Sequence, residues 1–184
     1  ATISDTATNL ATLTTASTDA ITITISDGVA ATIAELVTIN NATSGTVTLN
    51  SQTIAANYSD TAVNLAAAFS GITTHTGNLT ISETSTATIA ELVTINAATA
   101  GTVTLSTETI AANYSDTAVN LAAAFSGITT HTGTIAITGT NPTITQLNNI
   151  SGATSGVVTA TISDTATNLA TLTTASTDAI TITI

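Results

Sequence analysis

Seven short runs in which Ile, Val or Leu alternate with Thr or another small residue predict β-strands. They are Ile21–Ile25, Thr46–Asn50, Asn78–Ser82, Thr102–Ser106, Thr134–Thr138, Val157–Ile162 and Ile180–Ile184. A period of two places the aliphatic side chains on one face of a strand and the Thr side chains on the other. Each run is therefore expected to bury one face.

Between these runs, apolar residues recur at the spacing of an α-helix. Ile33, Leu36 and Ile39 follow one another at three-residue intervals, and the same pattern returns in residues 89–95. A second apolar stripe consists of Ala62, Leu65, Ala66 and Phe69. Each stripe covers one side of a short helix, so strands and helices are expected to alternate.

Two recurring motifs predict where the helices begin. In a capping box, a Thr hydroxyl and an acid or amide three residues later satisfy each other's backbone N–H groups. This pattern occurs at Thr32 with Glu35, Thr88 with Glu91 and Thr143 with Gln146. The second motif is Ser-Asp, whose carboxylate is predicted to cap a helix and to suit the positive end of its dipole. Its acids are Asp5, Asp60, Asp116 and Asp164.

Two further features predict how these elements end and connect. Gly45, Gly101 and Gly156 follow the first helix of each repeat and are predicted to stop it. The segment Asn50–Ala56 has no counterpart in the third repeat, and it is predicted to form a hairpin or a bulging loop.

The chain is built from internal repeats. Residues 32–49 return with small changes at 88–105, an offset of 56, and residues 160–184 are identical to residues 1–25, an offset of 159. We interpret residues 1–184 as a single repeat array, a window of a 159-residue superrepeat. Its units are residues 32–87, 88–142 and 143–184, with the last continuing as 1–31.

Alternation of strands with short helices predicts parallel strands joined by right-handed crossovers. The spacing of about 26 residues per coil is that of a solenoid. We therefore predict an α/β solenoid of stacked strand-plus-short-helix coils with a parallel sheet. An all-β solenoid is the alternative, because such short helices are marginal alone and Thr and Val weaken them.

Composition excludes several classes of function. The chain has no Lys or Arg and a formal net charge of −11, so it has no groups to neutralise nucleic-acid phosphates or anionic lipid heads. No apolar run reaches the roughly 18 residues of a membrane-spanning helix. Hydrophobic residues make up 43% of the chain but aromatic residues only 2%, which predicts a core of thin aliphatic layers.

Two motifs carry a resemblance to a known family. SDTAVNLAAAF at Ser59 and SDTATNLATL at Ser163 resemble the SDTAxNLAAL-type repeats of very large bacterial surface proteins. These repeats occur in cyanobacterial and proteobacterial adhesins and S-layer-like proteins. The resemblance implies an extracellular or cell-surface location and a structural or adhesive role. Such relatives often carry calcium-binding glycine-aspartate repeats, but this chain has no G-G-x-G-x-D motif.

Few residues are candidates for chemistry. His75 and His131 occupy equivalent places in two repeats, and each is predicted to be a solvent-exposed loop residue. Asp60, Asp116 and Asp164 either line up as a calcium file or act only as helix caps. No nucleophile–base pattern is visible, and no Lys, Arg or Cys is present to shift a pKa, so no catalytic site is expected.

The sequence therefore favours an extracellular structural repeat protein that forms a filament, sheath or surface layer. Its expected partner is another copy of itself in a homopolymer, or the continuation of a tandem array. One alternative is the spacer or stalk of a large bacterial adhesin, with a glycan or surface partner. A minor alternative is an ice-binding solenoid with flat ranks of Thr. Unequal coil lengths argue against that alternative, since regular ranks are expected to need coils of constant length.

Overall fold

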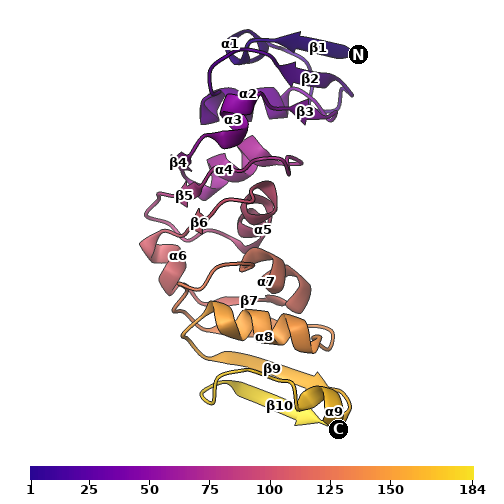
Figure 1. Cartoon of the computed structure of the whole chain (residues 1–184), viewed down its shortest axis with the longest axis vertical. Helices are drawn as coiled ribbons and strands as arrows, with labels where there is room; N and C mark the ends of the chain where they lie inside the picture. Colours follow the sequence, from indigo (N-terminus) through magenta and orange to yellow (C-terminus); the bar gives the residue numbers. More distant parts are fainter. The chain divides into compact units, whose positions relative to one another are not determined.

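A computed structural model describes residues 1–184 as an alternation of β-strands and α-helices (Figure 1). The strands are β1 (Thr2–Asp5), β2 (Thr22–Ile25), β3 (Val47–Thr48), β4 (Tyr58–Asp60), β5 (Leu79–Ile81), β6 (Val103–Thr104), β7 (Tyr114–Thr117), β8 (Ile135–Thr138), β9 (Val158–Ser163) and β10 (Ala179–Thr183). The helices are α1 (Ala7–Leu10), α2 (Ile33–Asn41), α3 (Ser51–Ala55), α4 (Ala62–Phe69), α5 (Ile89–Ala98), α6 (Thr107–Ala111), α7 (Ala118–Ala124), α8 (Ile144–Ala153) and α9 (Ala166–Leu169). Each predicted run overlaps a strand.

All strand pairs are parallel, and they form three small sheets. The strand orders are β1-β2-β3, β4-β5-β6 and β10-β9-β8-β7. A helix lies between every pair of consecutive strands, as is usual for parallel pairing. The protein is therefore an α/β protein with parallel sheets, and the all-β alternative is wrong.

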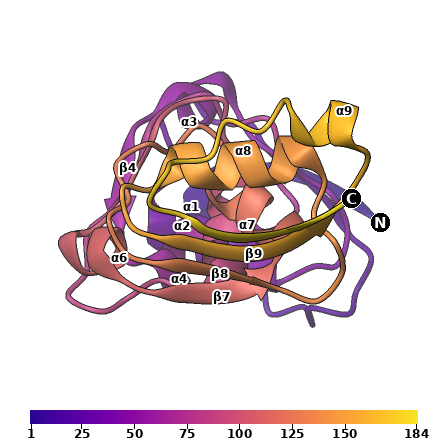
Figure 2. The same ribbon diagram turned by 90° about the horizontal axis from the view of Figure 1, so that it is seen from below.

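The chain forms two compact units. Unit 1 comprises Ala1–Glu83 and Thr94–Thr104, and unit 2 comprises Thr84–Val93 and Leu105–Ile184. Sheets β1-β2-β3 and β4-β5-β6 belong to unit 1, and the four-stranded sheet belongs to unit 2. In unit 2, α8 lies on one side of strands β7, β8 and β9 (Figure 2). The repeat boundaries inferred from the sequence remain a separate prediction.

The core of each unit consists mainly of small and aliphatic side chains, as the composition predicts. In α2, the predicted stripe Ile33, Leu36 and Ile39 is buried. In α4, the buried residues are Ala62, Leu65, Ala68 and Phe69, whereas Ala66 is partly exposed. Ile23 and Ile25 of β2 are also buried, while Thr22 at the start of the same strand is exposed. Period-two and helical patterning therefore place most of the core correctly, but the prediction is wrong for Ala66 and for the run Ile180–Ile184, where Ile182 and Ile184 are exposed.

The three predicted capping boxes are present. Thr32 Oγ1 accepts a hydrogen bond from Glu35 N at 3.2 Å, and Glu35 Oε2 accepts one from Thr32 N at 2.9 Å. The same reciprocal pair joins Thr88 with Glu91 and Thr143 with Gln146. These bonds satisfy two otherwise unpaired N–H groups at each helix start.

The segment Asn50–Ala56 is not a hairpin or a loop. It contains the helix α3, whose N-cap Asn50 accepts a hydrogen bond from Thr53 N at 2.7 Å through its side chain. The equivalent helix α6 is capped in the same way by Ser106. Thr53 is fully buried and its hydroxyl accepts from Ala31 N, so a polar side chain holds a core position here. Hydrophobic periodicity could not identify this helix.

Candidate functional site: repeated Thr-Gly junctions

We call one strand together with the segment that follows it a turn of the chain. A Thr-x-Gly motif joins one turn to an earlier turn at three places, which we call the Thr-Gly junctions. They are Thr43 with Gly45, Thr99 with Gly101 and Thr154 with Gly156. In each, Thr Oγ1 accepts from the Gly N–H at 2.8–2.9 Å. The same hydroxyl donates to the carbonyl oxygen of Ile21, Gly77 or Gly133, at 2.6, 2.6 and 2.7 Å respectively. One hydroxyl thus satisfies two backbone groups and fixes two turns together.

The glycines of these junctions do not stop helices, which corrects the prediction for Gly45, Gly101 and Gly156. Helix α2 ends at Asn41, and Gly45 follows only after its C-cap Ala42. A Cβ on any of the three glycines would collide with the backbone of the earlier turn. Glycine is required because two backbones approach closely. The glycines that follow helices with a left-handed backbone are Gly71 and Gly127, with φ of 72° and 73°.

Beside two of the junctions lie aromatic clusters, each formed by one Tyr, one Phe and one His. Cluster 1 comprises Tyr58, Phe69 and His75, and cluster 2 comprises Tyr114, Phe125 and His131. Ring centroids within a cluster lie 4.8–5.7 Å apart. Each His is only 1% exposed, so the prediction of solvent-exposed histidines is wrong. The clusters contain every aromatic residue of the chain.

Hydrogen bonds place a hydrogen on Nε2 of both imidazoles. The Nε2 atom of His75 lies 3.0 Å from Ala56 O, and that of His131 lies 2.9 Å from Ala112 O. A carbonyl oxygen only accepts, so Nε2 carries the hydrogen in both residues. The Nδ1 atom of His131 is buried without a hydrogen-bond partner, as suits an unprotonated nitrogen. Nε2 is therefore a hydrogen-bond donor in both histidines.

One of the histidines lies at the distance of a nucleophile–base pair from a hydroxyl. Thr99 Oγ1 lies 3.2 Å from His75 Nδ1. However, the Thr99 hydroxyl donates its hydrogen to Gly77 O at 2.6 Å and accepts from Gly101 N. It has no second hydrogen to give to the imidazole. This arrangement ties turns together and does not activate the hydroxyl.

Burial shifts the titration of these clusters. It lowers the pKa of His75 and His131 below the ordinary value of 6.5, and the hydrogen bonds to Ala56 O and Ala112 O oppose this shift only in part. It raises the pKa of Tyr58, whose hydroxyl donates to Ala31 O at 2.7 Å. Both effects favour uncharged side chains, as expected for groups that serve packing.

We expect the protein to lose stability as the pH falls below about 6.5. The folded state binds fewer protons than the unfolded state there, because the folded pKa of each His is depressed. The free energy of unfolding is therefore highest above that pH and decreases on acidification. Urea unfolding followed by circular dichroism between about pH 5 and 7 measures this slope.

The matched variant is His75→Phe combined with His131→Phe. It should remove most of the pH dependence in this interval. The pKa values of Asp5 and Glu35 are lowered too, but these carboxyls change the free energy of unfolding only near their ordinary pKa values of 3.8 and 4.5. Imidazole proton NMR gives a second measurement. Histidine signals that titrate above 6.5 in the folded protein would contradict the prediction.

The Asp of each Ser-Asp motif is not the N-cap of its helix, although the sequence predicts this role. The N-caps are the next residues, Thr6, Thr61, Thr117 and Thr165. Each Asp accepts the N-cap's own N–H and the side-chain amide of the Asn four residues after the Asp. For Asp60 these bonds come from Thr61 N at 2.7 Å and Asn64 Nδ2 at 2.8 Å. The same pair recurs at Asp5, Asp116 and Asp164.

The structure does not place the two calcium candidates of unit 2, Asp116 and Asp164, side by side. No group of three or more His, Asp or Glu side chains is placed to hold a metal ion. Asp60 lies in unit 1, whereas Asp116 and Asp164 lie in unit 2. Within unit 2, Asp116 pairs with Ile137 of β8, so a strand separates it from the end of β9. Each carboxylate is used by its own helix start.

Calcium at millimolar concentration is expected to leave the melting temperature unchanged. Each Asp supplies one carboxylate that already accepts two hydrogen bonds, and calcium prefers six to eight oxygen ligands. Thermal melting with calcium and with a chelator checks this. An increase in melting temperature that disappears in Asp116→Asn would restore the calcium file.

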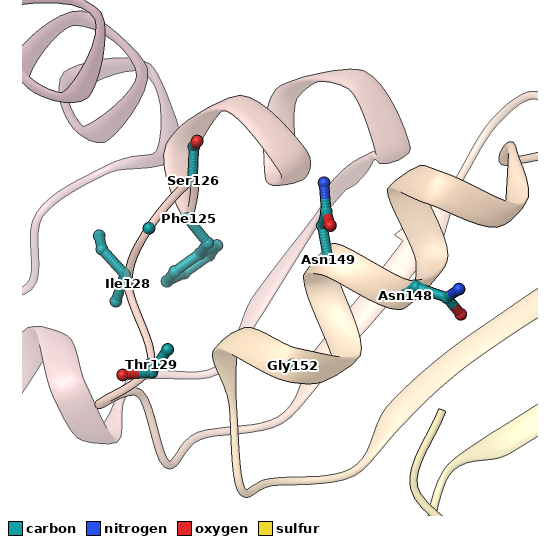
Figure 3. A pocket seen from close by; sticks show the side chains of 8 residues that line it. Phe125, Ser126, Ile128, Thr129, Asn148, Asn149 and Gly152 are labelled. Carbon is teal, nitrogen blue, oxygen red and sulfur yellow. The ribbon is translucent and has the colours of Figure 1, made fainter. Parts of the chain in front are cut away.

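Two surface hollows of the molecule offer only amides and hydroxyls as polar side-chain groups. One hollow of about 370 Å³ lies between the end of α7 and the helix α8 (Figure 3). Its lining includes Ser126, Thr129, Asn148 and Asn149 but no ionisable side chain. In unit 1, a hollow of about 430 Å³ beside α2 and α4 has a similar lining. Neither hollow contains a candidate for acid, base or nucleophilic catalysis.

Comparison of the chain with protein-family models, with curated proteins and with solved structures found no match. None of the helices is both long enough and apolar enough to cross a membrane. The resemblance to SDTAxNLAAL-type surface repeats therefore stays an expectation from the motifs themselves.

Proposed function

We propose that this chain is a non-catalytic, extracellular structural repeat protein whose strand-plus-helix coils continue as an α/β solenoid in a filament, sheath or surface layer. The observation that carries the proposal is the threefold use of one junction. Thr43, Thr99 and Thr154 make the same two hydrogen bonds to the backbone, in each case across a turn of the chain. Repetition of a contact between turns favours a scaffold over a single reactive centre.

The surroundings of the polar groups support this interpretation. Both histidines are buried in aromatic clusters. The Asp residues of the Ser-Asp motifs, such as Asp60, bind the first residues of their helices. The absence of Lys and Arg leaves no site for trypsin-like proteases, which suits material exposed outside cells. Exposed sheet edges of stacked coils also favour pairing with further coils.

Electron microscopy of the purified chain tests the proposal. We expect fibres or sheets whose amount increases with protein concentration, together with increasing light scattering. A folded chain that remains monomeric over a wide concentration range would overturn it. If such a monomer bound glycans on an array, the stalk of an adhesin would become the better function.

A second candidate function has one observation in its favour. Hydroxyl side chains form ranks on sheet β1-β2-β3, where Thr2 faces Thr22 and where Ser4, Thr24 and Thr48 follow one another. Thr22 follows Thr2 by 20 residues and Thr48 follows Thr24 by 24, yet the ranks stay in register. Unequal coils therefore do not exclude the ice-binding alternative. Thermal hysteresis in solution would support it, and its absence would remove it.

A further inference from the structure

The first and last 25 residues of the chain have the same sequence and the same fold. We call residues 1–25 the N-terminal segment and residues 160–184 the C-terminal segment. In the former, β1 pairs with β2 so that Ile3 faces Ile23. In the latter, β9 pairs with β10 so that Ile162 faces Ile182, which is the same register 159 residues on. The helices α1 and α9 also cover equivalent residues.

Each segment has a downstream face, on the side of the residues that follow it in sequence, and an upstream face, on the side of the residues that precede it. The two segments differ in whether the downstream face is covered. In the N-terminal segment, Ile23 and Ile25 are 0% and 2% exposed. Their equivalents in the C-terminal segment, Ile182 and Ile184, are 52% and 86% exposed. Leu10 is likewise buried, whereas its equivalent Leu169 is partly exposed. An apolar face that is closed in one segment is thus open in the other.

The upstream faces show the reverse difference. Ile162 is fully buried, and β9 continues the sheet beyond β8 through the pair Ile135 and Val158. Its equivalent Ile3 is only partly buried, and β1 is an edge strand. The same segment can therefore have either face covered, and nothing in its sequence prevents both from being covered at once.

Residues 26–49 are what covers the downstream face in the N-terminal segment. Strand β3 pairs with β2 through Val47 and Ile23, and Thr43 Oγ1 donates to Ile21 O at 2.6 Å. Near the helix starts, Thr8 Oγ1 of α1 donates to Glu35 Oε1 of α2 at 2.8 Å. The C-terminal segment carries the same residues at the equivalent positions, Thr167, Ile180 and Ile182.

We infer that the C-terminal segment of one copy docks on residues 26–49 of a second copy, in place of that copy's own N-terminal segment. The inference rests on the proposed function, because it names the interface by which copies would join. The incoming segment has the same sequence as the displaced one, so it can form the same hydrogen bonds and apolar packing in the same register. This interface joins opposite ends of two copies, so it does not close on itself and each copy can accept another.

The balance between free and joined chains depends on how firmly the N-terminal segment is held. Exchange replaces one segment by another of the same sequence, and the N-terminal segment has the advantage of being tethered beside its site. Weakening that segment alone should therefore shift the balance toward assembly. The change Ile23→Asp does this, because it places a carboxylate at a fully buried position.

The test compares three variants of residues 1–184 by light scattering during size-exclusion chromatography. Ile23→Asp is expected to form open-ended assemblies whose mass increases with concentration. Adding Ile182→Asp should restore monomers, since the docking face then carries the same buried charge. Adding Thr181→Asp instead is the matched control. It should leave assembly intact, because its equivalent Thr22 remains exposed when residues 26–49 cover the segment. Circular dichroism confirms folding, and Leu10→Asp weakens the same segment independently.

Two outcomes overturn the exchange. One is a folded Ile23→Asp protein, and likewise a folded Leu10→Asp protein, that stays monomeric at every concentration. The other is equal assembly of the Ile182→Asp and Thr181→Asp combinations, which would indicate non-specific association. Fibres of the unmodified chain that persist in Ile182→Asp would keep the proposed structural function and reject the exchange. If Ile23→Asp assembles by exchange but the unmodified chain forms no fibres, the exchange is kept and the proposed structural function is rejected.

Discussion

Gly133→Ala is expected to lower the free energy of unfolding by about 3 kcal/mol or more, at the upper end of the cost of overpacking. A Cβ at Gly133 would collide with the carbonyl group of Ala112 and with Ala111 O. Ala112 O also accepts the hydrogen bond from His131 Nε2, so it cannot move without loosening that bond. The obstacle is the backbone of residues 111 and 112, so rotation of a side chain cannot relieve it.

The matched control for this change is Gly152→Ala in α8 of the same unit. A Cβ at Gly152 meets no atom within 4 Å, and the residue is exposed. Since Ala favours helices over Gly, the control should be neutral or stabilise the protein by up to about 1 kcal/mol. Thermal and urea unfolding followed by circular dichroism measure both. Similar effects of the two substitutions would show that the turns do not approach as closely as described.

The elements that repeat a local pattern could be predicted from the sequence. Period-two runs predicted seven of the strands, and the Thr-x-x-Glu motifs predicted the starts of α2 and α5. The strands β1, β4 and β7 were not predicted in this way. In β4 and β7, Tyr-Ser-Asp at Tyr58 and Tyr114 has no alternation of aliphatic residues. Their pairing with β5 and β8 comes from neighbouring turns and not from local preference.

The residues of the candidate site could not be interpreted correctly where their role depends on a distant turn. Gly101 follows a helix and looks like a stop signal, but its partner is Gly77 on an earlier turn. His75 lies between Thr residues and looks exposed, but Tyr58 and Phe69 enclose its ring. A useful signal was present, since Tyr, Phe and His recur together at one offset. Joint recurrence of the only aromatic residues indicates a shared cluster.

The Ser-Asp motif was predicted correctly as a helix start and incorrectly in its register. An Asp at the N-cap would accept from the amide two or three residues on. Here Thr61 takes that role, and Asp60 instead accepts from the N–H of Thr61 and the amide of Asn64. The recurring string S-D-T-A-x-N is thus a complete local hydrogen-bonding unit. No ion is needed to explain its acids.

Phe69→Ala is expected to lower the free energy of unfolding by about 3–5 kcal/mol, the range for removing a buried aromatic side chain. The Phe69 ring is fully buried, and its centroid lies 5.7 Å from that of Tyr58 and 4.8 Å from that of His75. Removing it leaves a cavity beside His75, whose depressed pKa depends on burial. The variant should therefore be less stable and should also show a higher pKa for His75.

The same helix supplies the control for this substitution. Val63 of α4 is 60% exposed, so Val63→Ala should change stability by no more than about 0.5 kcal/mol. Urea unfolding gives the stability of both variants, and NMR of the imidazole gives the pKa of His75. A large loss of stability without any rise in this pKa would mean that the ring of Phe69 does not shield the histidine. A rise in pKa with the stability loss would tie packing and titration to one cluster, because the ring that fills the core also keeps water from the imidazole.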